Sequence, residues 1–146
     1  MNSVQIIPAR KEDLGEIQEL LKSADLPWQD VAEHLSDFLV ARSGESIIGA
    51  VGLEISGTGA LLRSLVVQPA VRRTGVGNAL YRRILDQARR RGIREVGLLT
   101  TTAEGFFLKA GFEKHDKGQV PDFVRTSREF RELCPSSAVY MRMIIQ

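Results

Sequence analysis

Two arginines and two glycines lie close together in the stretch VQPAVRRTGVGNALYRRIL, residues 67–85. Arg72 and Arg73 precede Gly75 and Gly77, between an apolar segment that ends at a proline and an amphipathic segment. The first backbone amides of a helix have no partner inside the helix and form a site for anions. Glycine lets a phosphate approach those amides closely. A plain turn would show the same letters, but this context indicates a phosphate site, with a pyrophosphate as its natural ligand.

Two common phosphate-binding motifs are missing from the sequence. It contains no G-x-x-x-x-G-K-[ST] motif and no G-x-G-x-x-G motif after the first predicted strand, which argues against nucleoside-triphosphate and dinucleotide binding. The formal net charge is only +2, yet many arginines gather within residues 72–94. They form either a solvated helix face or a local positive field for an anionic ligand. Because this cluster has no interleaved aromatic platform on which bases could stack, a nucleic-acid partner is not expected.

Length and composition are those of an ordinary globular protein. The chain has 146 residues, of which 26% are charged, and we expect one domain spanning residues 1–146. The single cysteine, Cys134, excludes an intramolecular disulfide, and we expect it to be buried and inert. No signal peptide, membrane-spanning run or metal site is expected, so we predict a cytoplasmic protein with no membrane partner.

Hydrophobic periodicity predicts strands alternating with helices. Strands are expected at residues 4–8, 38–43, 46–56, 60–67, 94–100 and 137–145. Helices are expected at 11–24, 28–37, 77–91 and 103–111, with 112–120 irregular or strand-like and 124–133 a turn or short helix. Three consecutive strands form a meander, and the order of elements predicts an α/β or α+β fold with a mixed sheet.

The stretch LRSLVVQPAVRRTGVGNALYRRIL, residues 62–85, resembles the acetyl-CoA-binding segment of the GNAT N-acetyltransferase superfamily. REVGLLT, AEGFFLKAGFEKHDK and SAVYMRMI follow in the order of that fold. More narrowly, LLRSLVV, LLTTTAEGFFLKAGF and LCPSSAVYMR resemble the arsenic-resistance N-acetyltransferases, and LLTTTAEGFF also resembles the acetyltransferase domain of N-acetylglutamate synthases. The resemblance implies a mixed, mostly antiparallel central sheet flanked by helices on both faces.

The resemblance also implies acetyl-CoA as co-substrate. The strand edge at Leu65–Val67 would hydrogen-bond the pantetheine like an added strand. The backbone N–H near Val66 would polarise the acetyl carbonyl, which makes Val66 a catalytic position. The residues expected to bind the cofactor are Leu65, Val66, Val67, Arg72, Arg73, Thr74, Gly75, Val76, Gly77, Asn78, Thr102, Phe106, Phe107 and Lys109.

Two positions depart from the pattern of the superfamily. Phe107 stands where many members have a tyrosine thought to protonate the leaving thiolate, which leaves Thr101, Thr102, Cys134 or water as the acid. Arg63 stands where many members have a glutamate that acts as a base. A guanidinium cannot accept a proton at neutral pH, but its planar fork binds carboxylates. Arg63 therefore favours a carboxylate-bearing acceptor, the alternative being a surface ion pair.

Since Arg63 cannot accept a proton, another residue must serve as the base that takes the proton from the amine. Glu54 is expected to share a sheet face with Arg63, either as a water-assisted base or as its neutralising partner. Glu33 and His34 are further candidates, and Arg125 is a second carboxylate-binding candidate. The residues expected to bind the acceptor are Arg63, Arg125, Glu33, Thr100 and Thr101.

These features predict an acetyl-CoA-dependent N-acetyltransferase. The acceptor would be the amine of a small amino-acid-like molecule, such as arsinothricin or a glutamate analogue, and it would attack the thioester directly. Two alternatives stay open: an enzyme of the same fold that acetylates proteins or peptides, and a non-catalytic acyl-CoA-binding sensor. A homodimer is possible, since dimers are common in the superfamily.

Overall fold

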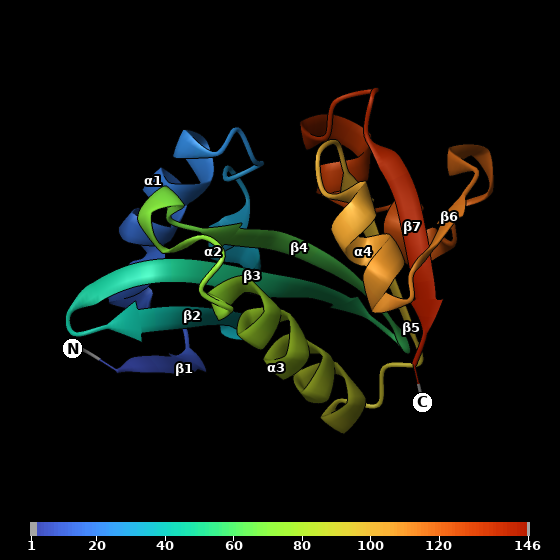
Figure 1. Ribbon diagram of the computed structural model, residues 1–146. Coiled ribbons are helices and arrows are strands. Elements are labelled where there is room, and N and C mark those ends of the chain that lie inside the picture. Colours follow the sequence, from blue (N-terminus) through green and yellow to red (C-terminus); the bar gives the residue numbers. More distant parts are fainter. Residues whose placement is uncertain (1–2, 146) are drawn as a thin grey trace. The chain divides into compact units, whose positions relative to one another are not determined.

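The computed structural model describes residues 3–145 (Figure 1). Its strands are β1 (Val4–Pro8), β2 (Phe38–Ser43), β3 (Ser46–Ser56), β4 (Gly59–Val67), β5 (Glu95–Thr100), β6 (Glu113–His115) and β7 (Val139–Ile144). Its helices are α1 (Leu14–Ser23), α2 (Val31–His34), α3 (Val76–Arg90), α4 (Glu104–Ala110) and α5 (Asp122–Arg125), with a π-helix, η5, at Glu129–Leu133.

The strands form one sheet of seven in the order β1-β2-β3-β4-β5-β7-β6. The pairs β1–β2, β2–β3, β5–β7 and β6–β7 are antiparallel, and β4–β5 is parallel. This confirms the mixed, mostly antiparallel sheet that the sequence predicts. Among residues 3–145, no helix combines the length and the apolar character that crossing a bilayer requires.

The chain divides into two compact units. Unit 1 comprises Met1–Leu53 and Ser64–Gln87, and unit 2 comprises Glu54–Arg63 and Ala88–Gln146. Strands β3 and β4 and helix α3 run from one unit into the other. The single domain predicted from the length stays a prediction, since each unit has a hydrophobic cluster of its own.

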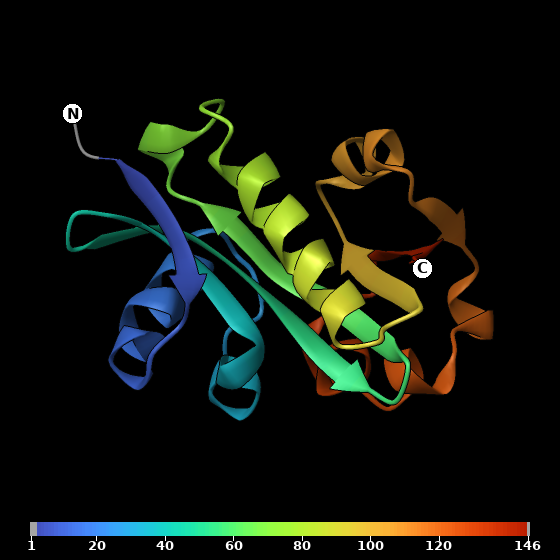
Figure 2. The same ribbon diagram turned by 90° about the horizontal axis from the view of Figure 1, so that it is seen from below.

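In unit 1, helices α1 and α3 cover opposite faces of the strands (Figures 1 and 2). Ala50 on β3 belongs to a core cluster with Ile17 and Leu21 of α1. The next residue along the strand, Gly49, faces α3, because a Cβ there would lie 2.9 Å from Leu80. Neighbouring residues of a strand point to opposite faces, so the alternation along β3 places one helix on each side.

In unit 2, glycines on adjacent strands let aromatic rings lie directly on the sheet. A Cβ at Gly59 on β4 would lie 2.3 Å from the Phe123 ring. A Cβ at Gly97 on β5 would lie 2.9 Å from Tyr140 and 3.2 Å from Val124 of α5. The segment Pro121–Cys134, which contains α5 and η5 and is called the cover segment below, therefore packs tightly on this face.

The predicted elements agree closely with the structure, apart from two segments. The helix expected at 28–37 is only α2, one turn long, followed by a 3-10 turn at Leu35–Asp37. The segment 124–133 contains the end of α5 and the π-helix η5. The buried hydroxyl of Ser127 connects them, since it donates to the carbonyl of Val124 at 2.7 Å and accepts from the amide of Phe130 at 3.1 Å.

Candidate active site

The turn between β4 and α3 is anchored to β3 inside unit 1. The backbone amide of Gln68 donates to the carbonyl of Ile48 at 2.8 Å, and its side-chain amide donates to the carbonyl of Ile47 at 3.0 Å. A 3-10 turn at Pro69–Val71 follows. These bonds fix the point where the chain leaves the sheet, and so fix where helix α3 begins.

The same turn presents a row of backbone donors. The backbone of Arg73 and Gly75 is left-handed, with φ of 67° and 91°, and the first helical bond runs from the amide of Ala79 to the carbonyl of Gly75 at 3.0 Å. Within residues 3–145, the amides of residues 73–78 donate to no protein group. Exposed guanidinium groups of Arg72 and Arg73 add positive charge. The turn therefore fits a bound pyrophosphate.

The glycine in the first turn of α3 sits against the end of β4. A Cβ on Gly77 would lie 3.4 Å from a methyl group of Val67 and would touch nothing else within 4 Å. Strand end and helix start are thus close neighbours in unit 1. A ligand bound at the helix start would have the edge Leu65–Val67 beside it.

The two halves of strand β4 differ in their described pairing with β5. Its described ladder with β5 joins Gly59–Leu61 to Glu95–Gly97 and ends before Leu65–Val67. Ser64 lies between the halves with φ of 62°, a conformation uncommon for a residue with a Cβ and typical of a bulge. Val66 is 5% exposed and packs in the core of unit 1, so the role predicted for it rests on its backbone amide rather than on its side chain.

Helix α4 places the residues predicted to lie near the thioester. The Phe107 ring is 4% exposed and makes edge-on contacts with Phe106 and Phe112, at centroid distances of 5.1 and 5.5 Å. Phe107 is thus a core residue of unit 2 without a hydroxyl, whereas Phe106 is 39% exposed. The hydroxyl of Thr100 accepts the amide of Ala103 at 2.9 Å and so caps the turn that leads into α4.

Thr101, Thr102 and Lys109 are exposed. The two threonines follow β5 directly, and Lys109 lies in the last turn of α4. Their roles in cofactor and acceptor binding stay predictions.

Arg63 on β4 is buried in unit 2 and already holds a carboxylate. Its Nε lies 3.3 Å from Oε2 of Glu129, and the two side chains are 0% and 6% exposed. Glu129 opens the π-helix η5 of the cover segment. The neutralising partner that the sequence placed at Glu54 is thus provided, at least in part, by Glu129. The surface ion pair considered for Arg63 does not describe this buried arrangement.

The other predicted acceptor residues lie in more open surroundings. Arg125 on α5 is exposed and forms an ion pair with Asp122 one turn earlier. Glu33 is exposed on α2, and Glu54 is partly buried near the end of β3. An exposed ion pair contributes little to stability, so Arg125 is available to an anionic ligand at small cost.

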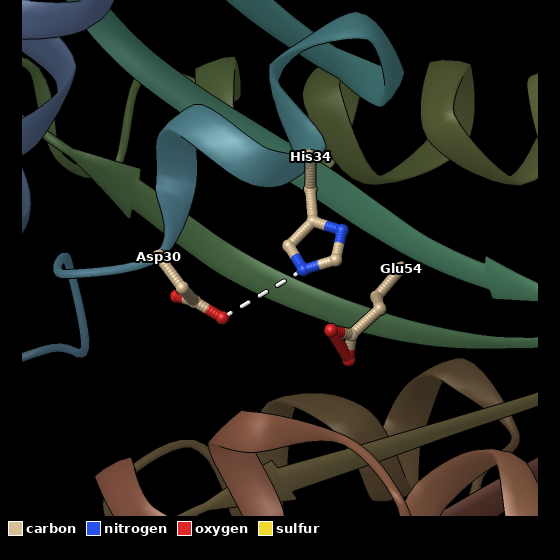
Figure 3. Close-up of side chains that lie close together, drawn as sticks. All are labelled: Asp30, His34 and Glu54. Atoms are coloured by element: carbon tan, nitrogen blue, oxygen red, sulfur yellow. Dashed lines mark ion pairs between the residues drawn. The ribbon is translucent and has the colours of Figure 1, made fainter.

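His34 has a buried carboxylate beside it. Its Nε2 lies 3.8 Å from Oδ2 of Asp30, whose side chain is fully buried (Figure 3). The third side chain drawn in Figure 3, Glu54, comes from β3. A carboxylate next to an imidazole orients the ring, which suits a base. Asp30 was not among the residues predicted for the site, although its four-residue spacing to His34 is a usable signal.

Cys134 is a poor acid and a poor nucleophile. Burial, followed by the charge of Glu129, raises the pKa of its thiol to about 12 from the usual 9.0, against smaller lowering effects of Lys117 and Arg63. The thiol of a leaving CoA has a pKa near 8.5, so proton transfer to it from Cys134 would run uphill. Cys134 is therefore not favoured over the other predicted acids, which are Thr101, Thr102 and water.

We expect Cys134 to react slowly with a disulfide reagent at pH 8. The pKa of about 12, against 9.0 in an unfolded chain, lowers the thiolate fraction about a thousandfold. The rate of thiol release with 5,5′-dithiobis(2-nitrobenzoate), measured in native protein and in urea, checks this. Equal rates in the two states would show that the thiol is open to solvent. The raised pKa also stabilises the fold below about pH 9, and this contribution is lost between about pH 9 and 12.

A family model described as "Acetyltransferase (GNAT) domain" matches residues 34–114, more than half of the chain. The chain belongs to the GNAT acetyltransferases. A curated relative, the IAA acetyltransferase of Azospirillum brasilense, is 30% identical in an alignment of 115 residues that covers 75% of each protein. Acetyl-CoA is therefore the co-substrate of this GNAT protein, and the donor row at the start of α3 fits it.

Solved structures share the fold. N-acetylglutamate synthase from Neisseria gonorrhoeae, complexed with coenzyme A and N-acetyl-glutamate, aligns with a TM-score of 0.84 at 20% identity. The alignment covers the whole chain but only 36% of the synthase. Rv2747 from Mycobacterium tuberculosis, in complex with CoA and NLQ, aligns with a TM-score of 0.80 at 22% identity over 97% of this chain and 99% of that one.

Proposed function

We propose that this GNAT protein acetylates the amine of a small amino-acid-like acceptor whose carboxylate is bound by Arg63. The observation that carries the proposal is the buried Arg63, whose Nε already has a carboxylate oxygen 3.3 Å away. A guanidinium kept from water in this way binds a carboxylate more strongly than an exposed lysine or arginine would. Arg125 serves as a second, exposed anion-binding group.

The reaction is a direct transfer. The donors at residues 73–78 hold the pyrophosphate and the backbone of Leu65–Val67 holds the pantetheine, with the amide near Val66 polarising the thioester carbonyl. The neutral amine attacks the carbonyl carbon, so that a C–N bond forms and the C–S bond breaks. The amine proton passes to a base, and the thiolate leaves with a proton from water. Most of the acceleration comes from positioning and from stabilising the oxyanion.

Two groups are candidates for the base. Glu54 is partly buried on β3, and His34 on α2 is oriented by Asp30. Glu129 lies beside Arg63, and Glu54 stays a candidate both for the base and for a second partner of Arg63. A carboxylate and an imidazole can each accept a proton from an amine, directly or through one water.

The acceptor class follows from the charge of Arg63. A glutamate-like amino acid carries both the amine to be acetylated and a carboxylate for the guanidinium. Arsinothricin, a glutamate analogue with an arsenic oxyanion, has the same two features, and acetylation would mask its amine. The resemblance of LLRSLVV and LCPSSAVYMR to arsenic-resistance enzymes supports this choice.

Thiol release from acetyl-CoA tests the proposal. We expect release with L-glutamate, phosphinothricin or arsinothricin and at least about tenfold less with their uncharged amides, since each lost charged hydrogen bond costs about 1.5–3 kcal/mol. In the same assay, Glu54→Gln or His34→Gln should lower kcat without raising the acceptor KM, whichever residue is the base. Release with peptide amines alone would favour a protein acetyltransferase. Acetyl-CoA binding without release would favour a sensor.

A further inference from the structure

We propose that Glu129 determines the acceptor specificity of this enzyme by competing with the acceptor carboxylate for Arg63. The inference rests on the proposed function, in which Arg63 binds that carboxylate. Glu129 lies 3.3 Å from Nε of Arg63 and belongs to the cover segment. The guanidinium that an acceptor must bind therefore already has a carboxylate partner in the protein.

The backbone around Glu129 is built to hold this carboxylate in place. The π-helix η5 starts at Glu129. π-helical turns are rare in proteins, and those that occur are often found at functional sites. The carbonyl of Glu129 accepts the amide of Cys134 at 2.8 Å, which closes the turn. On the other side, Ser127 ties the start of η5 to α5. The side chain thus projects toward Arg63 from a backbone that is fixed at both ends.

Packing of the cover segment sets the depth of the pair. Phe123 and Val124 lie directly over Gly59 and Gly97, where any larger side chain would collide. This close approach brings Glu129 down to the strand that carries Arg63, and it leaves both side chains at most 6% exposed. A carboxylate from an acceptor must therefore share or replace the place that Glu129 occupies.

Stability alone is a weak reason for such a pair. Two buried charges lose hydration, and well-packed apolar residues usually replace them without loss. A pair of opposite charges can, however, make a site selective for charged ligands. Neutral groups cannot replace the carboxylate of Glu129, and anions bind less tightly because they must compete with it. The geometry thus explains how the site would be selective for strongly anionic acceptors while binding them only moderately.

Glu129→Gln tests this inference by removing the competing charge with little change in shape. We expect the KM for L-glutamate to fall about tenfold, while the KM for acetyl-CoA and for glutamine amide stays unchanged. We also expect L-glutamate to raise the melting temperature of this variant more than that of the wild type. The second readout needs no turnover. If Glu129→Gln does not fold, Glu129→Asp replaces it, since it keeps the charge but shortens the side chain. We expect its KM for L-glutamate to lie below that of the wild type, by less than the tenfold expected for Glu129→Gln.

Glu132→Gln is the matched control. Glu132 lies on the same π-helix, but it is exposed and pairs with Arg128 at 2.9 Å. We expect it to behave as the wild type in both measurements. Suppose that the wild type acetylates glutamate. The inference is then overturned if the glutamate KM falls equally in Glu132→Gln, or if it is unchanged or higher in Glu129→Gln. If neither wild type nor variant uses or binds any anionic amino acid, the proposed function fails together with it.

Discussion

Replacing Gly75 by alanine is expected to raise the KM for acetyl-CoA about tenfold or more and to leave the acceptor KM unchanged. Gly75 has φ of 91°, a conformation that costs a residue with a Cβ about 1–2 kcal/mol. To relieve that strain, the turn must rotate and re-aim the amides of Val76, Gly77 and Asn78. Each amide lost from the pyrophosphate removes a charge-assisted hydrogen bond. Steady-state kinetics and calorimetric titration with CoA measure the effect.

Gly15→Ala provides the matched control for this experiment. A Cβ has open space within 4 Å at both glycines, but only Gly75 has a positive φ. Gly15 lies in helix α1, where alanine should stabilise the protein by about 0.5–1 kcal/mol and leave both KM values unchanged. If Gly75→Ala binds CoA as tightly as Gly15→Ala does, the turn after β4 does not hold the pyrophosphate.

Local patterns in the sequence are sufficient to predict most of the fold. An apolar run between the turn residues Gly44 and Gly57 places β3 at its observed bounds. Gly111, which has φ of 106°, ends α4 as expected for a helix C-terminus. The helix start at residues 75–78 is likewise a local signal. These features depend on neighbours within a few residues, and for that reason one sequence suffices to find them.

The parts that escaped prediction depend on distant contacts. Arg63 and Glu129 are far apart in the chain, and only the packing of the cover segment on Gly59 and Gly97 brings them together. The hydroxyl of Thr100 caps the turn before α4, which the sequence did not indicate, and its predicted contact with the acceptor stays a prediction. The acceptor half of the site is therefore known less well from sequence than the cofactor half.

Arg63→Met is expected to lower the free energy of unfolding by about 3–5 kcal/mol, because it leaves the buried carboxylate of Glu129 without its guanidinium. The double variant Arg63→Met/Glu129→Leu should regain most of that loss, since it removes both charges and fills the space with apolar atoms. Urea denaturation followed by circular dichroism gives all three values. With Glu129→Leu added as the second single variant, the same measurements complete a double-mutant cycle and give the coupling energy of the pair.

Arg128→Met separates this effect from that of an ordinary ion pair. Arg128 also belongs to the cover segment and pairs with Glu132, but both side chains are exposed, so we expect a loss below about 1 kcal/mol. A loss no larger than this for Arg63→Met would show that solvent reaches the pair. Recovery of stability in the double variant would show that folding does not require the two charges. If apolar residues replace the pair without loss of stability, while acetylation of anionic amines disappears, then the charges at Arg63 and Glu129 serve acceptor binding rather than folding.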